Sequence, residues 1–209
     1  MSIKVISFDV DGVLFNTDEI YFIYLRKALR KIGAKINQAF YIHHGYDDCI
    51  YDLSLSKKDI AKVKQVIQKQ YYNDSILSCM RMKNGVLPAL KSLSEKFKFA
   101  IGSGENKLQI ERYLNHFSLT DFFSFIGHSA LVKGRKSNPA YFRAITDFYG
   151  VKPNECLHVG DNLIDQYALN AHMHVVIIPT KYSKYLSFDS RCHILKNIKL
   201  LPRLLSQFR

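Results

Sequence analysis

The sequence lacks the features that mark membrane, secreted and zinc-binding proteins. None of its apolar stretches is long enough to span a bilayer, and no signal-peptide core precedes the first strand-like segment. Its few cysteines are scattered, without the CxxC spacing of a zinc or redox motif: Cys49, Cys79, Cys156 and Cys192. We interpret them as reduced thiols and therefore expect a cytoplasmic protein with no membrane partner and no zinc site.

Acidic residues are also scarce, with 18 Asp+Glu against 30 Lys+Arg and a formal net charge of +12. Such a charge could attract nucleic acid, an anionic membrane or small phosphorylated ligands. The positive residues are spread along the whole chain instead of forming one block. Because dispersed charge is typical of a solvated surface, we do not expect nucleic acid as the partner.

Internal repeats and low-complexity segments are absent, and 209 residues with 47% hydrophobic content suffice for one core plus a small inserted unit. From Gly85 on, short apolar runs alternate with segments of helical periodicity. The helix expected at 138–150 is well delimited, with Asn138 as its cap, Pro139 at its first position and Gly150 past its end. This alternation predicts an α/β fold, a parallel sheet with helices on both faces.

Residues 17–85 have a different pattern, which indicates helices throughout. Asn16 can cap the first helix, with Glu19 three residues later as its reciprocal partner. Ser56 begins a second helix in the same way. The stretch YIHHGYDDCIYD, residues 41–52, is rich in tyrosine, histidine and aspartate, and we expect a polar loop there and not a second metal site.

The two patterns together predict two domains. The α/β core would consist of residues 1–16 and 86–209, and residues 17–85 would form an inserted helical domain. The insertion leaves the core directly after the first strand. The connections near residues 15–17 and 83–85 would then act as a hinge.

Polar side chains follow four of the expected strands, where parallel sheets of this kind bind their ligands. They are Asp9, Asp11, Ser103, Lys136, Asp161 and Asp165. Strand alternation puts Asp9 and Asp11 on the same side of the sheet. Their mutual repulsion, with Asp161 added, requires a cation, and carboxylate oxygens suit a hard divalent ion, by default Mg²⁺.

These residue types fit one chemistry. A carboxylate next to an electrophilic phosphorus can act as a nucleophile. A neighbouring carboxyl can protonate the leaving oxygen and later deprotonate water. A serine and a lysine can supply hydrogen-bond donors and positive charge to the phosphoryl oxygens.

The motifs DVDGVL at residues 9–14, Ser103 after an apolar strand, Lys136 ahead of a helix and GDNLID at 160–165 together resemble the four motifs of the haloacid dehalogenase superfamily. The insertion after the first motif resembles the helical cap of the subgroup that contains phosphoglycolate phosphatase and β-phosphoglucomutase. The resemblance implies a Rossmann-like core with a helical cap, and a Mg²⁺-dependent phosphatase of small phosphorylated metabolites that works through an aspartyl-phosphate.

The resemblance also implies roles for single residues. Asp9 would be the nucleophile and Asp11 the general acid and base. Ser103, Gly104 and Lys136 would bind the substrate phosphate, and Ser103 and Lys136 would take part in catalysis.

A metal site is implied as well. Its ligands would be the Asp9 carboxylate, the main-chain carbonyl of Asp11 and the Asp161 carboxylate, with Asp165 in support.

The sequence departs from the family pattern at two places. Ser137 stands where proline often follows the lysine of the third motif, so Lys133 is a rival of Lys136, although the spacing from Lys136 to Pro139 favours Lys136. Glu105 stands in the second motif where many relatives have small polar residues, and this leaves the substrate open.

Several functions remain open beside hydrolysis. A sugar phosphomutase would return the phosphoryl group to another hydroxyl, whereas dehalogenation and phosphonate hydrolysis are disfavoured by the second aspartate, Asp11. A non-enzymatic protein that binds phosphate or nucleic acid would use the positive charge alone. His158 lies within a predicted strand, and we expect it to be a core residue and not a catalyst. The sequence determines neither the substrate nor the oligomeric state.

Overall fold

The structure is a computed structural model that describes residues 2–71, 75–133 and 135–208, except for the side chains of residues 42–48, 71, 75 and 135. The chain forms two compact units. Met1–Phe15 and Met82–Arg209 form a core unit, and Asn16–Arg81 form a helical unit. In the described part of the chain, no helix is long and apolar enough to cross a membrane.

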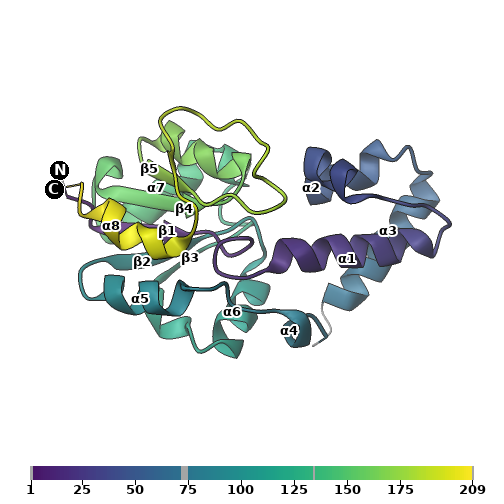
Figure 1. Cartoon of the computed structure of the whole chain (residues 1–209), viewed down its shortest axis with the longest axis horizontal. Coiled ribbons are helices and arrows are strands. Elements are labelled where there is room, and N and C mark those ends of the chain that lie inside the picture. The colour runs from purple at the N-terminus through teal and green to yellow at the C-terminus, as the bar shows by residue number, and fades with distance from the viewer. Residues whose placement is uncertain (1, 72–74, 134, 209) are drawn as a thin grey trace. The chain divides into compact units, whose positions relative to one another are not determined.

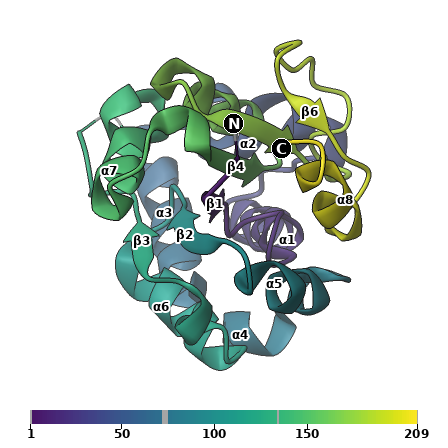
Figure 2. The ribbon, with the colours of Figure 1, turned by 90° about the vertical axis from the view of Figure 1, so that its left-hand side faces the viewer.

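A six-stranded parallel sheet forms the centre of the core unit (Figure 1). Its strand order is β3-β2-β1-β4-β5-β6, so β1 lies between β2 and β4, and β3 and β6 form the edges (Figure 2). The strands are β1 (Val5–Phe8), β2 (Lys98–Gly102), β3 (Phe125–Gly127), β4 (Cys156–Gly160), β5 (His174–Ile177) and β6 (His193–Ile194). After β3 the chain crosses to β4 on the other side of β1, so the direction of the strand order reverses between β1 and β4. Such a switch point is the usual place for a ligand in a sheet of this kind.

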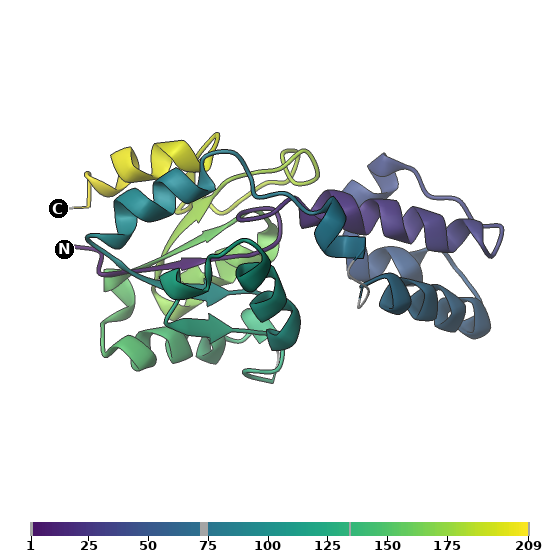
Figure 3. The same cartoon turned by 90° about the horizontal axis from the view of Figure 1, so that it is seen from below.

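Helices cover both faces of this sheet, which confirms the predicted fold class. One face carries α7 (Pro139–Tyr149) and the 3-10 helix η4 (Leu163–Ala171), and the other carries α5 (Val86–Ser94) and α6 (Lys107–His116). The short α8 (Leu201–Leu205) packs beside α5 (Figure 3). Short 3-10 helices complete the unit: η1 (Thr120–Phe122), η2 (Arg135–Ser137), η3 (Pro153–Glu155) and η5 (Ile198–Leu200).

Alternation along the strands decides which side chains meet which helix. Val5 and Cys156 pack with Tyr141 and Phe142 of α7 in one buried cluster. Because side chains two residues apart share a face, the residues that follow Val5 and Cys156 by two positions also point toward α7. On the opposite face, Phe8 meets Phe99 edge to face, with ring centroids 5.3 Å apart.

The helical unit consists of α1 (Thr17–Arg30), α2 (Gln38–Asp52), α3 (Lys57–Tyr71) and α4 (Ser75–Cys79). Helix α1 packs against both α2 and α3 (Figure 1). Its buried side chains include Leu25 and Leu29, and α3 contributes Val63.

Two local predictions in this unit are wrong. The stretch 41–52 is not a loop but belongs to α2, which begins at a helix cap where Asn37 accepts the N–H of Phe40. Asn16 makes no side-chain capping bond to α1, because its Oδ1 atom accepts the N–H of Arg81. The Asn16 side chain therefore joins the two ends of the helical unit.

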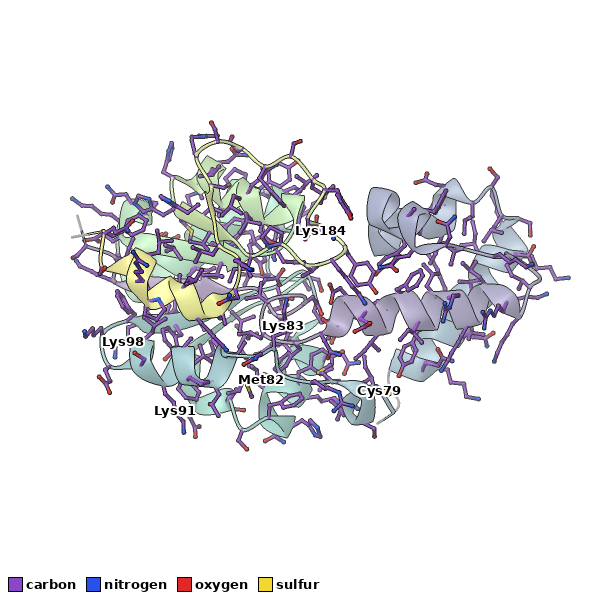
Figure 4. All side chains as sticks on the ribbon, in the orientation of Figure 1. Cys79, Met82, Lys83, Lys91, Lys98 and Lys184 are labelled. Atoms are coloured by element: carbon purple, nitrogen blue, oxygen red, sulfur yellow. The ribbon has the colours of Figure 1, made fainter. Side chains whose placement is uncertain are left out.

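The chain returns to the core unit through Met82 and Lys83 (Figure 4). The Lys83 N–H donates to the Leu14 carbonyl at 2.9 Å. The Lys83 ammonium donates to the Gly12 carbonyl. This returning segment therefore supports the loop that follows β1.

Three exposed lysines of the core unit lie apart from one another. Lys91, Lys98 and Lys184 are exposed and project from separate elements (Figure 4). Their arrangement agrees with dispersed, solvated charge.

Candidate active site

The loop after β1 presents a buried carboxylate. The Asp9 N–H continues the pairing of β1 with β4 by donating to the Val159 carbonyl at 2.8 Å. Its Oδ1 atom accepts the Val10 N–H at 2.7 Å, and its Oδ2 atom lies 2.8 Å from Lys136 Nζ. Both carboxylate oxygens of Asp9 therefore have protein partners. The residue is only 6% exposed.

The same loop requires a glycine. Gly12 has φ +70°, a backbone conformation that residues other than glycine rarely adopt. A Cβ atom at this position would collide with the carboxylate of Asp161, which follows β4. The close approach brings the ends of β1 and β4 together.

Asp165 is fully buried, and protein donors reach both of its carboxylate oxygens. Its Oδ2 atom accepts the N–H groups of Asp161 at 2.9 Å and of Asn162 at 3.0 Å. Its Oδ1 atom lies 2.6 Å from Lys136 Nζ and 3.0 Å from His158 Nε2. Burial opposes ionisation of this carboxyl, but Lys136 and His158 outweigh it and hold the pKa of Asp165 below its usual range.

Lys136 of η2 joins the two carboxylates. It is 1% exposed, and its ammonium lies within hydrogen-bond distance of both Asp9 and Asp165. Burial alone would lower the pKa of Lys136, but the two carboxylates raise it, so the ammonium stays charged. The rival Lys133 is exposed, and its carbonyl accepts a hydrogen bond from the Asn138 side chain.

The environment of Asp9 is less favourable to a charge. Burial raises the pKa of Asp9 to about 8, against the attraction of Lys136. The charges of Asp165 and Asp11 contribute to this rise. A divalent cation at Asp9 would favour its ionised form.

Ser103 follows β2 and is fully buried. Its N–H donates to the Gly127 carbonyl at 3.1 Å, and its carbonyl accepts the Tyr141 hydroxyl at 2.7 Å. Its Oγ atom accepts the Glu105 N–H at 3.1 Å. Gly104 is exposed, with open space where a side chain would stand.

Glu105 turns toward the start of α6. Its Oε1 atom accepts both the main-chain N–H of Asn106 at 2.6 Å and the Asn106 side-chain amide at 2.8 Å. These two bonds occupy one oxygen of the carboxylate that departs from the family pattern.

Three carboxylates of the site fit a cation. Asp9, Asp161 and Asp165 each offer an oxygen, and these oxygens lie within 4.8 Å of one another. All three side chains are buried, and an all-oxygen set suits a hard divalent ion. Because Asp165 already accepts four hydrogen bonds from the protein, Asp9 and Asp161 are the better placed ligands. Asp11 is half-buried, and its side chain is outside this group.

The structure adds partners that the sequence analysis did not find. Tyr141 positions the Ser103 carbonyl, and His158 reaches Asp165 from within β4. The one available signal for His158 was a histidine in an otherwise apolar strand. The side chains of His43, His44, Tyr46, Asp47 and Asp48, in the stretch 41–52, lie outside the described residues.

A parallel sheet that gathers buried carboxylates and a buried lysine at its central strand ends defines an α/β protein with a candidate ligand site at the topological switch point. Comparison with known sequences is more specific: residues 6–178 match the haloacid dehalogenase-like hydrolase family. The chain belongs to this family, and the predicted family and its hydrolase class are confirmed.

Individual relatives are distant in sequence. Pyrophosphatase PpaX of Bacillus cereus (strain AH820) is 25% identical over 165 residues, which cover 78% of this chain and 76% of the relative. Among solved structures, a predicted phosphoglycolate phosphatase from Haemophilus somnus 129PT has a TM-score of 0.82 at 18% identity, with 98% of each chain covered. CbbY from Rhodobacter sphaeroides in complex with phosphate has a TM-score of 0.77 at 16% identity, with 95% of this chain and 96% of CbbY covered.

Proposed function

We propose that this protein is a Mg²⁺-dependent phosphatase that hydrolyses small phosphorylated metabolites through an aspartyl-phosphate on Asp9. One observation carries the proposal. The Asp9 carboxylate is buried at the strand switch point, 2.8 Å from the Lys136 ammonium, and shares a cluster with Asp161 and Asp165. A nucleophile, a cation for the phosphoryl oxygens and metal ligands are thus available within one small volume.

In the first half-reaction, an Asp9 carboxylate oxygen attacks the phosphorus of the substrate. A bond forms between this oxygen and phosphorus, and the bond from phosphorus to the leaving oxygen breaks. Asp11 donates its proton to the leaving oxygen, which departs as an alcohol.

In the second half-reaction, the ionised Asp11 takes a proton from a water molecule. The water oxygen bonds to phosphorus, and the bond from phosphorus to Asp9 breaks. Inorganic phosphate leaves, and Asp9 and Asp11 return to their starting states.

Lys136 and Ser103 stabilise both steps. The Lys136 ammonium neutralises charge on the phosphoryl oxygens, and the Ser103 hydroxyl and the Gly104 N–H donate hydrogen bonds to them. Mg²⁺ held by Asp9, the Asp11 carbonyl and Asp161 would supply further positive charge for the transferred group. Asp165 keeps Lys136 in place.

The relatives support a small phosphorylated substrate. One is a pyrophosphatase, one is a predicted phosphoglycolate phosphatase, and CbbY has been solved with phosphate and with xylulose-(1,5)bisphosphate. We propose the same class of ligand for this chain, with phosphoglycolate, pyrophosphate and sugar phosphates as the first compounds to test.

The test is a panel of these compounds incubated with the protein and Mg²⁺, with and without EDTA. We expect release of inorganic phosphate from at least one compound, and loss of this release in EDTA. Phosphorus NMR on the same mixtures separates hydrolysis from transfer, because a phosphomutase would move the phosphoryl group without releasing phosphate. Absence of phosphate release across the panel would reject the proposal, and transfer without release would favour the phosphomutase instead.

We further propose that the helical unit sets substrate preference. Support comes from its insertion point, since the chain leaves the core unit seven residues after the end of β1, just beyond the loop that carries Asp9 and Asp11. Substitutions within residues 41–52 should change relative rates across the panel, whereas Asp9→Asn should lower the rate for every compound alike. Equal relative rates in these α2 variants and in the wild type would count against this role.

A further inference from the structure

Ser7 and His158 form a polar pair inside the sheet. They are register partners on β1 and β4, and both are fully buried. His158 Nδ1 lies 3.2 Å from Ser7 Oγ. Burial of polar groups in a strand centre is costly unless they are hydrogen-bonded, so this pair stands out in strands that are otherwise apolar.

The neighbouring strand makes room for the pair. A Cβ atom on Gly102 of β2 would lie 2.6 Å from Ser7 Oγ and 3.1 Å from His158 Cε1. On the remaining side, the Phe142 ring of α7 packs against the imidazole, with centroids 4.9 Å apart. The imidazole is therefore packed between Ser7, Gly102 and Phe142.

The hydrogen bonds select one tautomer of His158. An ionised carboxylate can only accept, so the contact of 3.0 Å from His158 Nε2 to Asp165 Oδ1 places the proton on Nε2. Burial lowers the pKa of His158, which keeps the ring neutral. The Nδ1 atom is then an acceptor, and the Ser7 hydroxyl donates to it.

We propose that His158, oriented by Ser7, is a positioning residue that acts through Asp165 on the Lys136 ammonium. The inference rests on the proposed phosphatase function. The contacts run without a gap from Ser7 to His158, to Asp165, to Lys136 and to Asp9. His158 itself would touch neither the substrate nor the reacting atoms.

The geometry at Asp165 explains what His158 adds. Two main-chain N–H groups hold Oδ2, whereas two side chains, Lys136 and His158, hold Oδ1. The His158 bond to Oδ1 is a third anchor and fixes the plane of the carboxylate. Lys136 Nζ then meets Oδ1 at 2.6 Å and keeps its other contact with Asp9.

The first test compares two substitutions of His158. His158→Leu removes the donor, whereas the side-chain amide of His158→Gln can donate from about the position of Nε2. Outer-shell partners of such sites typically contribute about 10- to 100-fold in activity, so we expect a loss of this size in kcat/KM for His158→Leu. His158→Gln should recover most of it.

A double substitution separates positioning from a merely structural effect. The residual activity expected of Lys136→Met can be followed at high enzyme concentration, and His158→Leu should cause no further loss in this background. An equal loss with and without Lys136 would overturn the proposal, because His158 would then not act through Lys136.

The second test needs no activity. With ¹⁵N-labelled lysine, the buried Lys136 ammonium should give a slowly exchanging signal in the wild type and in His158→Gln. This exchange should accelerate at least tenfold in His158→Leu, and in Ser7→Ala if the leucine variant fails to fold. Unchanged exchange in a folded variant would overturn the proposal.

The ¹⁵N shifts of His158 should further report a proton on Nε2, and a proton on Nδ1 alone would also overturn the proposal. If no phosphate ester is hydrolysed, the proposed function fails, while the exchange and tautomer measurements still decide the role of His158.

Discussion

The Lys136 ammonium lies 2.8 Å from the Asp9 carboxylate and 2.6 Å from the Asp165 carboxylate. It therefore forms a buried bridge between the loop that follows β1 and the helix η4 that follows β4. Breaking a buried ion pair by removing one partner is costly because the remaining charge is left uncompensated. Lys136 therefore stabilises the site as well as taking part in the proposed chemistry.

Replacement of this lysine should affect both stability and rate. In Lys136→Met measured without Mg²⁺, two buried carboxylates would face each other without a cation, and the free energy of unfolding should fall by about 3 to 5 kcal/mol. The turnover number should drop by about 10² to 10³, as for removal of one donor to a developing oxyanion. Thermal melting and steady-state kinetics measure the two effects.

Lys133→Met is the matched control for that variant. Because Lys133 is exposed, its replacement should change the free energy of unfolding by less than about 0.5 kcal/mol and leave the turnover number unchanged. A large loss in Lys133→Met, with a small one in Lys136→Met, would assign the phosphate-site lysine to Lys133.

Asp9→Asn should abolish turnover and preserve the fold. The substitution keeps the shape of the side chain but removes the nucleophile, and the rate should fall by more than about a thousandfold. Circular dichroism checks that the protein is folded. Activity within tenfold of the wild type would remove Asp9 from the nucleophilic role.

Gly12→Ala should damage the site more than an ordinary strained glycine substitution does. At φ +70°, an added Cβ collides with the Asp161 carboxylate, and the activity should drop at least tenfold, on the order of a lost positioning contact. Gly150→Ala is the control, since Gly150 has φ +61° and open space around its Cβ position. It should lose about 1 to 2 kcal/mol of stability without a change in activity, and equal activities in the two variants would refute the close approach.

Mg²⁺ should stabilise the folded protein through the acidic cluster. At a Mg²⁺ concentration of 100 times Kd, binding contributes about 2.7 kcal/mol, which raises Tm. Asp161→Asn should abolish this Mg²⁺-dependent rise, because it removes a ligand from the cluster. Asp189→Asn alters a carboxylate that pairs with Arg191 on the surface, and it should keep the rise. A full rise in Asp161→Asn would exclude this residue as a ligand.

The sequence by itself determined the fold class, and it predicted most residues of the candidate site. Apolar runs followed directly by Asp9, Ser103 or Asp161 are local signals, because a buried strand and the polar residue at its end are adjacent in the chain. Parallel strands present their carboxyl ends at one edge, so these residues could be grouped without coordinates.

Local signals failed where packing decided the structure. The polar stretch 41–52 suggested a loop, yet it belongs to helix α2, in which Tyr41, Cys49 and Ile50 are buried. Tertiary packing thus outweighed the local composition. The sequence predicted Asn16 as a helix cap, but its side chain accepts a hydrogen bond from the N–H of Arg81, which is distant in sequence.

Only the tertiary structure could decide how the site residues pair. Alternation along β4 places His158 on a face of the sheet but does not say which groups lie beside it. Strand order puts β4 next to β1, and this adjacency brings His158 to Ser7 and the Val159 carbonyl to the Asp9 N–H, whereas Lys136 reaches Asp9 from η2, which follows β3. The spacing to Pro139 already favoured Lys136 over Lys133, and the structure adds burial beside two carboxylates, an energetic condition set by residues far apart in the chain.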